Sequence, residues 1–226
     1  MKIINKKDFL KTCIPALEEI FESLTNFSPL YISNLEVNRT VLVIVDMING
    51  FTREGPLRSP YIELLIPEIL EVQKVCNKLG IATIAFADNH DPNSPEFETY
   101  PAHCILGTSE AEIVDEIKEV GKLGKYTLIA KNSTNAFLED KFQEWLMIKQ
   151  EINTFLITGD CSDICIEQLA TTLKAWFNKQ NKKSRIIVPL NAIDTYDFGL
   201  HNRDLMNILA LYNMQKNGVE IVTRLL

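Results

Sequence analysis

The chain has 226 residues, of which 46% are hydrophobic, and this is enough for one globular domain with a sizeable core. Its net charge of −7 gives no general attraction to phosphate backbones or anionic lipids, so neither nucleic acid nor a membrane is an expected partner. No apolar run is long enough to cross a bilayer and the basic start lacks a signal-peptide core, so we expect a cytoplasmic protein.

Residues 1–38 are expected to form an N-terminal helical extension, separate from a domain at 39–226. Apolar side chains recur there at helical spacing from Phe9 to Leu24, and Pro15 is expected either to kink the helix or to start it. We expect this helix to pack on the sheet or on a second subunit. The alternative is a lid over a binding site.

From residue 39 onward, strands alternate with helices. Short apolar, β-branched runs predict six strands, at 41–45, 81–87, 126–130, 153–158, 185–189 and 219–223. Apolar stripes of helical period lie between them, for example from Ile62 to Val75 and from Leu205 to Tyr212. This alternation predicts a three-layer α/β fold with a six-stranded, mainly parallel sheet and helices on both faces.

Reactive side chains follow three of these strands. Asp46 comes directly after 41–45, Lys131 directly after 126–130, and Cys165 shortly after 153–158. The carboxyl ends of strands in an open α/β sheet line the ligand crevice, so the three side chains are expected to meet there. Their convergence predicts an enzyme with a covalent thiol mechanism.

Cys165 is also expected at the N-terminus of a helix, with Asp163 as its N-cap. Such a position lowers the pKa of a thiol and offers backbone N–H donors to an oxyanion. The five cysteines are an odd number without a secretory signal, so we expect reduced thiols. The three side chains also have ordinary alternatives. Cys165 could be a buried structural cysteine, Asp46 a capping carboxylate and Lys131 a solvated lysine.

A second cluster follows the strand at 81–87. Asp88 and His90 are two residues apart, and His103 could complete an open-sided set of ligands suited to zinc, iron or manganese. The alternative is two loop histidines that hydrogen-bond to nearby carboxylates, and Glu96 and Glu98 are close enough in sequence to serve. Near the C-terminus, Asp194 and Asp197 are expected to cap helices, and His201 to be a surface or capping residue.

The order of these motifs resembles the isochorismatase-like cysteine hydrolases, and among them the nicotinamidases. The resemblance covers roughly residues 40–226 and includes a Rossmann-like strand order. It rests on four segments: Val43 to Phe51, Asp88 to Thr108, Lys131 to Phe137 and Gly159 to Cys165.

The resemblance implies a role for each site residue. Cys165 would be the nucleophile, Asp46 would move its proton, and Lys131 would hold the pair. Asp88, His90 and His103 would bind a divalent metal; zinc is expected, with iron or manganese as alternatives. A cis peptide at Asp160–Cys161 would aim the backbone N–H groups of Cys161 and Cys165 at the oxyanion.

The implied reaction is the hydrolysis of nicotinamide to nicotinate and ammonia through a thioester. Phe51, Tyr100 and Phe137 would then wall the flat ring of the substrate. Family members often assemble as dimers or tetramers, so a homo-oligomer is expected. The alternatives are hydrolysis of another small amide, of carbamoyl or ureido type, on the same three residues, or a non-catalytic metabolite-binding protein of this fold.

Overall fold

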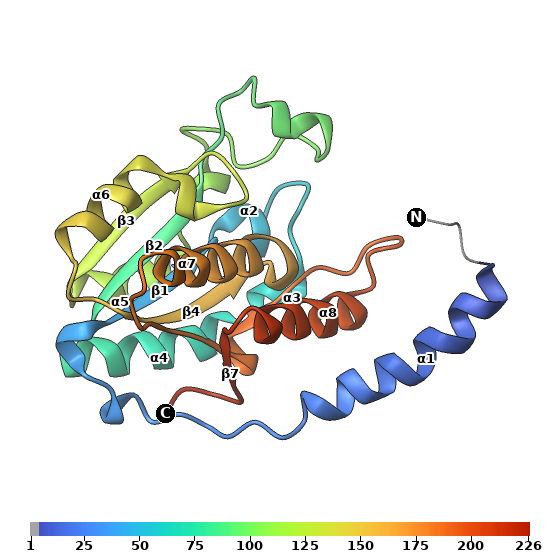
Figure 1. Cartoon of the computed structure of the whole chain (residues 1–226). Helices are drawn as coiled ribbons and strands as arrows, with labels where there is room; N and C mark the ends of the chain where they lie inside the picture. Colours follow the sequence, from blue (N-terminus) through green and yellow to red (C-terminus); the bar gives the residue numbers. More distant parts are fainter. Residues whose placement is uncertain (1–4) are drawn as a thin grey trace.

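A central sheet of parallel strands organises the molecule (Figure 1). The computed structural model describes residues 5–226, and within them the strand order is β3-β2-β1-β4-β5-β7, with β6 paired to β4. The strands are β1 Thr40–Val45, β2 Ala82–Asp88, β3 Tyr126–Lys131, β4 Thr154–Asp160, β5 Arg185–Pro189, β6 Ile193–Asp194 and β7 Glu220–Val222. The predicted α/β class, parallel sheet and Rossmann-like order are confirmed.

The six predicted strands are present, each displaced by two residues or fewer at either end. The seventh, β6, is absent from the prediction because two residues carry no periodic signal. It continues the sheet beside the end of β4, where Gly159 and Asp160 pair with Ile193 and Asp194.

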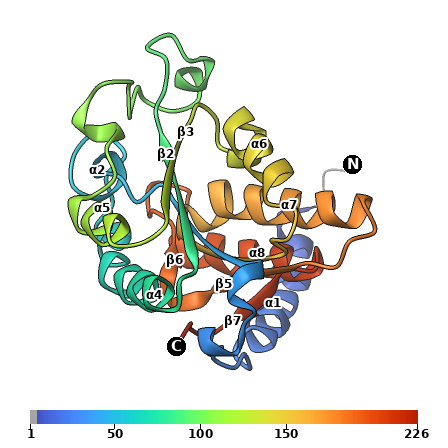
Figure 2. The ribbon, with the colours of Figure 1, turned by 90° about the vertical axis from the view of Figure 1, so that its left-hand side faces the viewer.

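Helices cover both faces of the sheet (Figure 2). The main helices are α4 Ile66–Leu79 and α5 Asp115–Lys122 on one face, and α6 Asp140–Ile148, α7 Glu167–Lys179 and α8 Arg203–Lys216 on the other. Alternate residues of β1 explain this arrangement: Val41, Val43 and Val45 belong to one core cluster, and Leu42 and Ile44 to the other.

Shorter turns connect these elements. Two are the single-turn helices α2 Asn49–Thr52 and α3 Pro60–Glu63, and a π-helical turn, Ser162–Ile166, precedes α7. The 3₁₀ turns are Ile32–Asn34, Val37–Arg39, Pro95–Glu98, Ser109–Ala111, Ala136–Leu138 and Leu190–Ala192. No helix within residues 5–226 is both long and apolar enough to cross a membrane.

The register brings the predicted site residues to one edge of the sheet. Asp88 pairs with Lys131 at the ends of β2 and β3, and Val45 pairs with Gly159 at the ends of β1 and β4. Gly159 has a φ of 114°, and a Cβ there would collide with the carbonyl oxygen of Val45. Only glycine allows this close approach of the two strands.

The N-terminal extension contains the predicted helix, α1 Lys6–Ser23, and Pro15 lies inside it. Residues 1–4 of the extension lie outside the described residues. The helix contacts α8, in line with the expectation of a packing helix. The next segment joins the domain: Leu30 and Ile32 hydrogen-bond to the last residues of the chain. The domain boundary at residue 38 stays a prediction.

Candidate active site

Asp46, Lys131 and Cys165 converge at the carboxyl edge of the sheet. Lys131 Nζ lies 2.8 Å from Asp46 Oδ2 and 3.7 Å from Cys165 Sγ. All three side chains are buried. The predicted meeting of a carboxylate, an amine and a thiol is therefore present in the geometry, while their catalytic roles stay a prediction.

The backbone fixes the orientation of Asp46. Its φ of 55° lies in the left-handed region, which Asp tolerates better than most side chains. Its N–H donates to Phe86 O at 3.0 Å, and its Oδ1 accepts from the N–H of Asp88 at 3.0 Å. These bonds leave Oδ2 directed at the lysine.

Lys131 holds two carboxylates together. Its Nζ lies 2.5 Å from Asp88 Oδ1 as well as near Asp46, and it donates to Ser133 O at 3.1 Å. Burial alone would lower the pKa of Lys131, but the charges of Asp46 and Asp88 outweigh it and raise the pKa well above the usual range. The site therefore contains a permanent cation.

The pKa of Asp46 is far above that of an ordinary aspartate. Burial, followed by the charge of Asp88, raises its pKa, and Lys131 and Cys165 lower it; the net result is a pKa of about 7. A carboxylate with this pKa can accept a proton and return it near neutral pH, which is the property a general acid–base requires.

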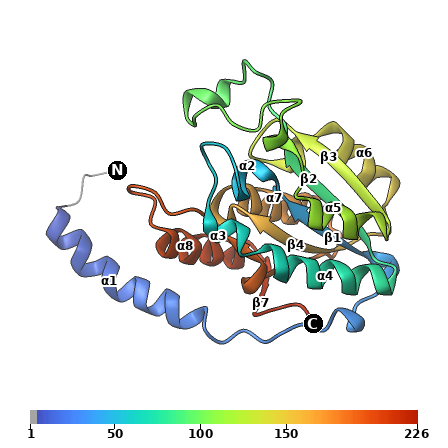
Figure 3. The same ribbon diagram turned by 180° about the vertical axis from the view of Figure 1, so that it is seen from behind.

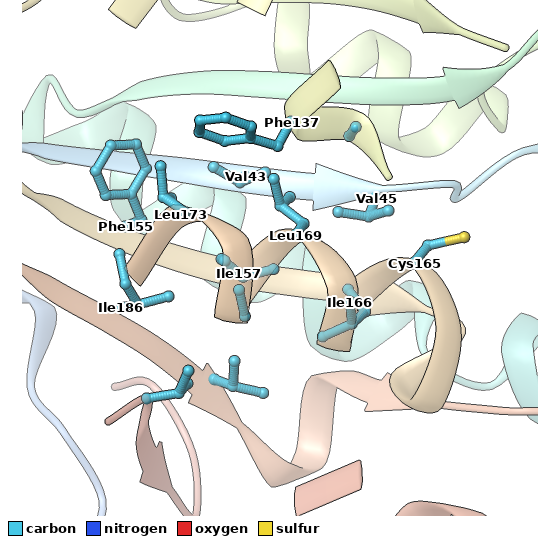
Figure 4. Packing of buried hydrophobic residues seen from close by; sticks show 14 of the residues in the cluster. Val43, Val45, Phe137, Phe155, Ile157, Cys165, Ile166, Leu169, Leu173 and Ile186 are labelled. Carbon is cyan, nitrogen blue, oxygen red and sulfur yellow. The ribbon is translucent and has the colours of Figure 1, made fainter. Parts of the chain in front are cut away.

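Cys165 occupies the π-helical turn before α7, not the first turn of a regular α-helix. Burial raises the pKa of its thiol above the usual value, although Lys131 opposes this. The lowered pKa expected from a helix N-terminus is therefore not found, because desolvation dominates. Burial thus favours the neutral thiol, which needs a base to become a nucleophile. The sulfur points away from the packed core side chains (Figure 4).

Asp163 does not cap the helix as predicted. It lies within the π-helical turn, and its Oδ2 is 2.8 Å from Nε2 of His201. His201 also lies 2.9 Å, through Nδ1, from the carbonyl oxygen of Tyr196 and stacks on the Tyr196 ring. His201 therefore ties the loop that carries Tyr196 to the cysteine turn.

The peptide bond between Asp160 and Cys161 is cis, as the resemblance implied. The use of the Cys161 and Cys165 N–H groups by an oxyanion stays a prediction. All five cysteines are free thiols, in agreement with the expectation from their number.

Asp88, His90 and His103 form a compact group of potential metal ligands. One ligand atom from each residue lies within 4.8 Å of the others, and all three side chains are buried. Two histidines and a carboxylate on one side of a site are a common set for a divalent metal.

Neighbouring groups orient both histidines for this purpose. Nδ1 of His90 donates to Asn132 Oδ1 at 3.1 Å, and Nδ1 of His103 donates to Pro101 O at 2.8 Å. Each Nε2 is then free for a ligand, as is typical of metal-binding histidines. Nε2 of His90 is buried and lacks a hydrogen-bond partner among the described residues, so the group fits an ion. Glu96 Oε1 lies 3.9 Å from this nitrogen.

A cavity of about 610 Å³ opens above the sulfur and the metal-ligand group. Its wall includes two of the three predicted ring-binding residues, Phe51 and Tyr100. The third, Phe137, packs in the core instead, with its ring centroid 6.3 Å from Phe142 and 6.0 Å from Trp176 (Figure 4). The 3₁₀ turn after β3 directs this side chain toward α7 and away from the cavity.

Further cavity residues come from the segment after β6. Tyr196, Asp197 and Phe198 all contribute to the wall. Asp197 was predicted to cap a helix, but it lies in the cavity wall instead, and Asn202 is the N-cap of α8. Asp194 also differs from its prediction as a cap: its carboxylate accepts from the Arg203 side chain at 2.8 and 2.5 Å and from Asn207 at 2.9 Å. This network holds the segment against α8.

Similarity to known proteins agrees with this geometry. The Isochorismatase domain family matches residues 40–208. The chain is 29% identical to Nicotinamidase 1 of Arabidopsis thaliana, an alignment that covers 81% of this chain and 85% of that protein. Its fold is similar to the pyrazinamidase/nicotinamidase of Streptococcus mutans, with a TM-score of 0.69, 20% identity, and coverage of 81% and 99%. The pyrazinamidase of Pyrococcus horikoshii, solved in complex with zinc, has a TM-score of 0.66, 20% identity, and coverage of 81% and 98%.

Proposed function

The chain belongs to the isochorismatase family, and we propose that it is a cysteine-dependent amidohydrolase that converts nicotinamide to nicotinate and ammonia. One observation supports this above all others. A buried thiol and a carboxylate with a pKa of about 7 both lie against one buried cation, beside a three-ligand metal group.

The first half of the reaction forms a thioester. Asp46 takes the proton of Cys165, and the thiolate attacks the amide carbon of the substrate. The electron pair of the carbonyl moves to oxygen, where the N–H groups of Cys161 and Cys165 meet it, each donor contributing about 3 kcal/mol. The carbonyl re-forms, the C–N bond breaks, and ammonia leaves with the proton from Asp46.

The second half regenerates the enzyme. Asp46 takes a proton from water, whose oxygen attacks the thioester carbon. The C–S bond breaks, the sulfur regains its proton from Asp46, and the acid that forms loses its proton to solvent to give nicotinate. Asp46 therefore takes up and releases a proton twice in each turnover, and Lys131 keeps the carboxylate form accessible in this buried place.

We propose zinc as the ion that Asp88, His90 and His103 hold. The two free Nε2 atoms and one carboxylate suit zinc, and a similar fold binds it in the Pyrococcus horikoshii pyrazinamidase. When bound, the ion supplies a Lewis acid that can ligate the ring nitrogen of nicotinamide. A carbamoyl or ureido amide has no such nitrogen, so the metal group favours nicotinamide over these alternatives.

The wall of the cavity suits the flat ring of nicotinamide. Phe51 and Tyr100 give the cavity flat apolar surfaces for a ring. A cytoplasmic location and a homo-oligomer, dimer or tetramer, stay predictions from the sequence.

The test is ammonia release from nicotinamide by the purified full chain, with metal analysis of the same sample. We expect turnover, about one zinc per chain, and loss of turnover in Cys165→Ala. Cys13→Ala, in α1 and outside the pocket, is the matched control and should keep full activity. His103→Ala should lose the metal, while His201→Ala should keep it. A folded, metal-loaded chain that releases no ammonia from nicotinamide would refute the proposed substrate.

A further inference from the structure

The helix α1 exposes an apolar face that the rest of the described chain leaves largely uncovered. The other helices of eight or more residues each bury side chains, whereas α1 buries none. It is the outermost helix and runs beyond the end of α8 (Figure 3). Ile20, near its C-terminal end, packs partly against the core.

Four apolar side chains of α1 form a regular seam. It consists of the exposed Leu10, Ile14 and Phe21 with the half-buried Leu17, at spacings of four, three and four residues, which is the heptad spacing of a coiled coil. The exposed Phe9 lies outside this spacing. Leu10 is 44% exposed, Ile14 54% and Phe21 56%. Pro15 lies outside the seam. We refer to these four residues as the α1 seam.

The charges beside the α1 seam indicate what covers it. Lys11 and Glu18 occupy the same flanking position in successive heptads. If two α1 helices pair in antiparallel orientation about a two-fold axis, Leu10 meets Phe21 of the second copy and Ile14 meets its Leu17. Lys11 then lies beside Glu18 of the second copy, and symmetry repeats the pair.

Parallel pairing of two α1 helices would be less favourable than antiparallel pairing. It would place Lys11 next to Lys6 of the second copy, which puts like charges together. The helix also has a reason to need a partner. An 18-residue helix with an internal proline lacks one backbone hydrogen bond and is marginal unless its apolar face is buried.

We propose that two copies of the chain associate through antiparallel pairing of the α1 seam. The pairing is isologous and closes on itself, so it does not lead to open polymers. No residue of the α1 seam lines the active-site cavity. The inference therefore goes beyond the proposed function and does not depend on it.

The first test is the mass of the full chain in solution, measured by analytical ultracentrifugation over a range of concentrations. The chain mass is 25.7 kDa. We expect an assembly of at least twice this mass, and a double substitution, Ile14→Glu with Phe21→Glu, that halves it. Leu123→Glu is the matched control, because Leu123 is 83% exposed on α5's C-terminal side and away from α1.

The second test uses the charges. Lys11→Glu alone and Glu18→Lys alone should each weaken association roughly tenfold, because each places two like-charged pairs across the interface. The two changes together should restore it, since the exchanged side chains would again face each other with opposite charges. Circular dichroism and thermal melting check that every variant is folded.

Three results would overturn the inference. The first is a wild-type chain that stays monomeric at every concentration measured. The second is an assembly whose mass is unchanged by the double substitution in the α1 seam, which would assign the contact to another surface. The third is failure of the charge exchange to restore association, which would reject the antiparallel orientation.

Discussion

The acid limb of the pH–rate profile depends on the pKa that Asp46 has in the folded protein. As the base, Asp46 must be ionised, so activity is present above its pKa and is lost as the pH falls through it. Burial and the charge of Asp88 raise this pKa from 3.8 to about 7, against the opposing effects of Lys131 and Cys165. We therefore expect kcat/KM for nicotinamide to fall below neutral pH, well above the range of an ordinary aspartate.

The size of the effect follows from the two pKa values. With a pKa of about 7, roughly 1% of Asp46 is ionised at pH 5, whereas an ordinary aspartate would be roughly 90% ionised there. Between pH 8 and pH 5 we expect a decrease of about 100-fold in kcat/KM, against less than about twofold for an unperturbed carboxyl group.

Steady-state ammonia release at saturating and limiting nicotinamide gives the profile. Metal content must be measured at each pH, because protonation of His90 or His103 would also release the ion. The reasoning is refuted if kcat/KM stays constant down to pH 5 while the metal remains bound. In that case Asp46 is either an ordinary carboxylate or not the base.

Three further outcomes follow from the packing. Lys131→Met leaves two carboxylates buried without a cation, so it should abolish activity and lower the free energy of unfolding by about 3–5 kcal/mol; unchanged denaturant midpoints would contradict this. Phe137→Ala should cost about 3–5 kcal/mol of stability with little change in KM, whereas Tyr196→Ala should raise KM with little loss of stability; the reverse pattern would exchange their assigned places. Gly159→Ala should prevent folding or lower the melting temperature sharply, and a native-like melting curve would disprove the close approach of β1 and β4.

The sequence could predict the sheet and the meeting of Asp46, Lys131 and Cys165 because both follow from the chain's local pattern. A strand buried on both faces is a continuous apolar run, and the next polar residue lies at the strand end. In a parallel sheet these ends share one edge, so three separate segments predict one site without any distance information.

Other features depend on contacts that no local pattern encodes. Phe137 has the aromatic side chain expected of a ring-binding residue, but the turn that carries it directs the side chain toward α7. The pKa of Cys165 depends on the balance of burial against Lys131, and the helix position alone gives the wrong direction. Asp163 was expected as a cap because of its place in sequence, yet His201, 38 residues away, determines its role.

Identification of the covalent intermediate tests the central claim most directly. Mass spectrometry of the full chain, quenched with acid during nicotinamide turnover and then digested, should find the Cys165 peptide heavier by the mass of nicotinamide less ammonia. The same adduct should be absent from Cys165→Ala, which should release no ammonia. An adduct on a different residue, or steady ammonia release from Cys165→Ala, would contradict the mechanism.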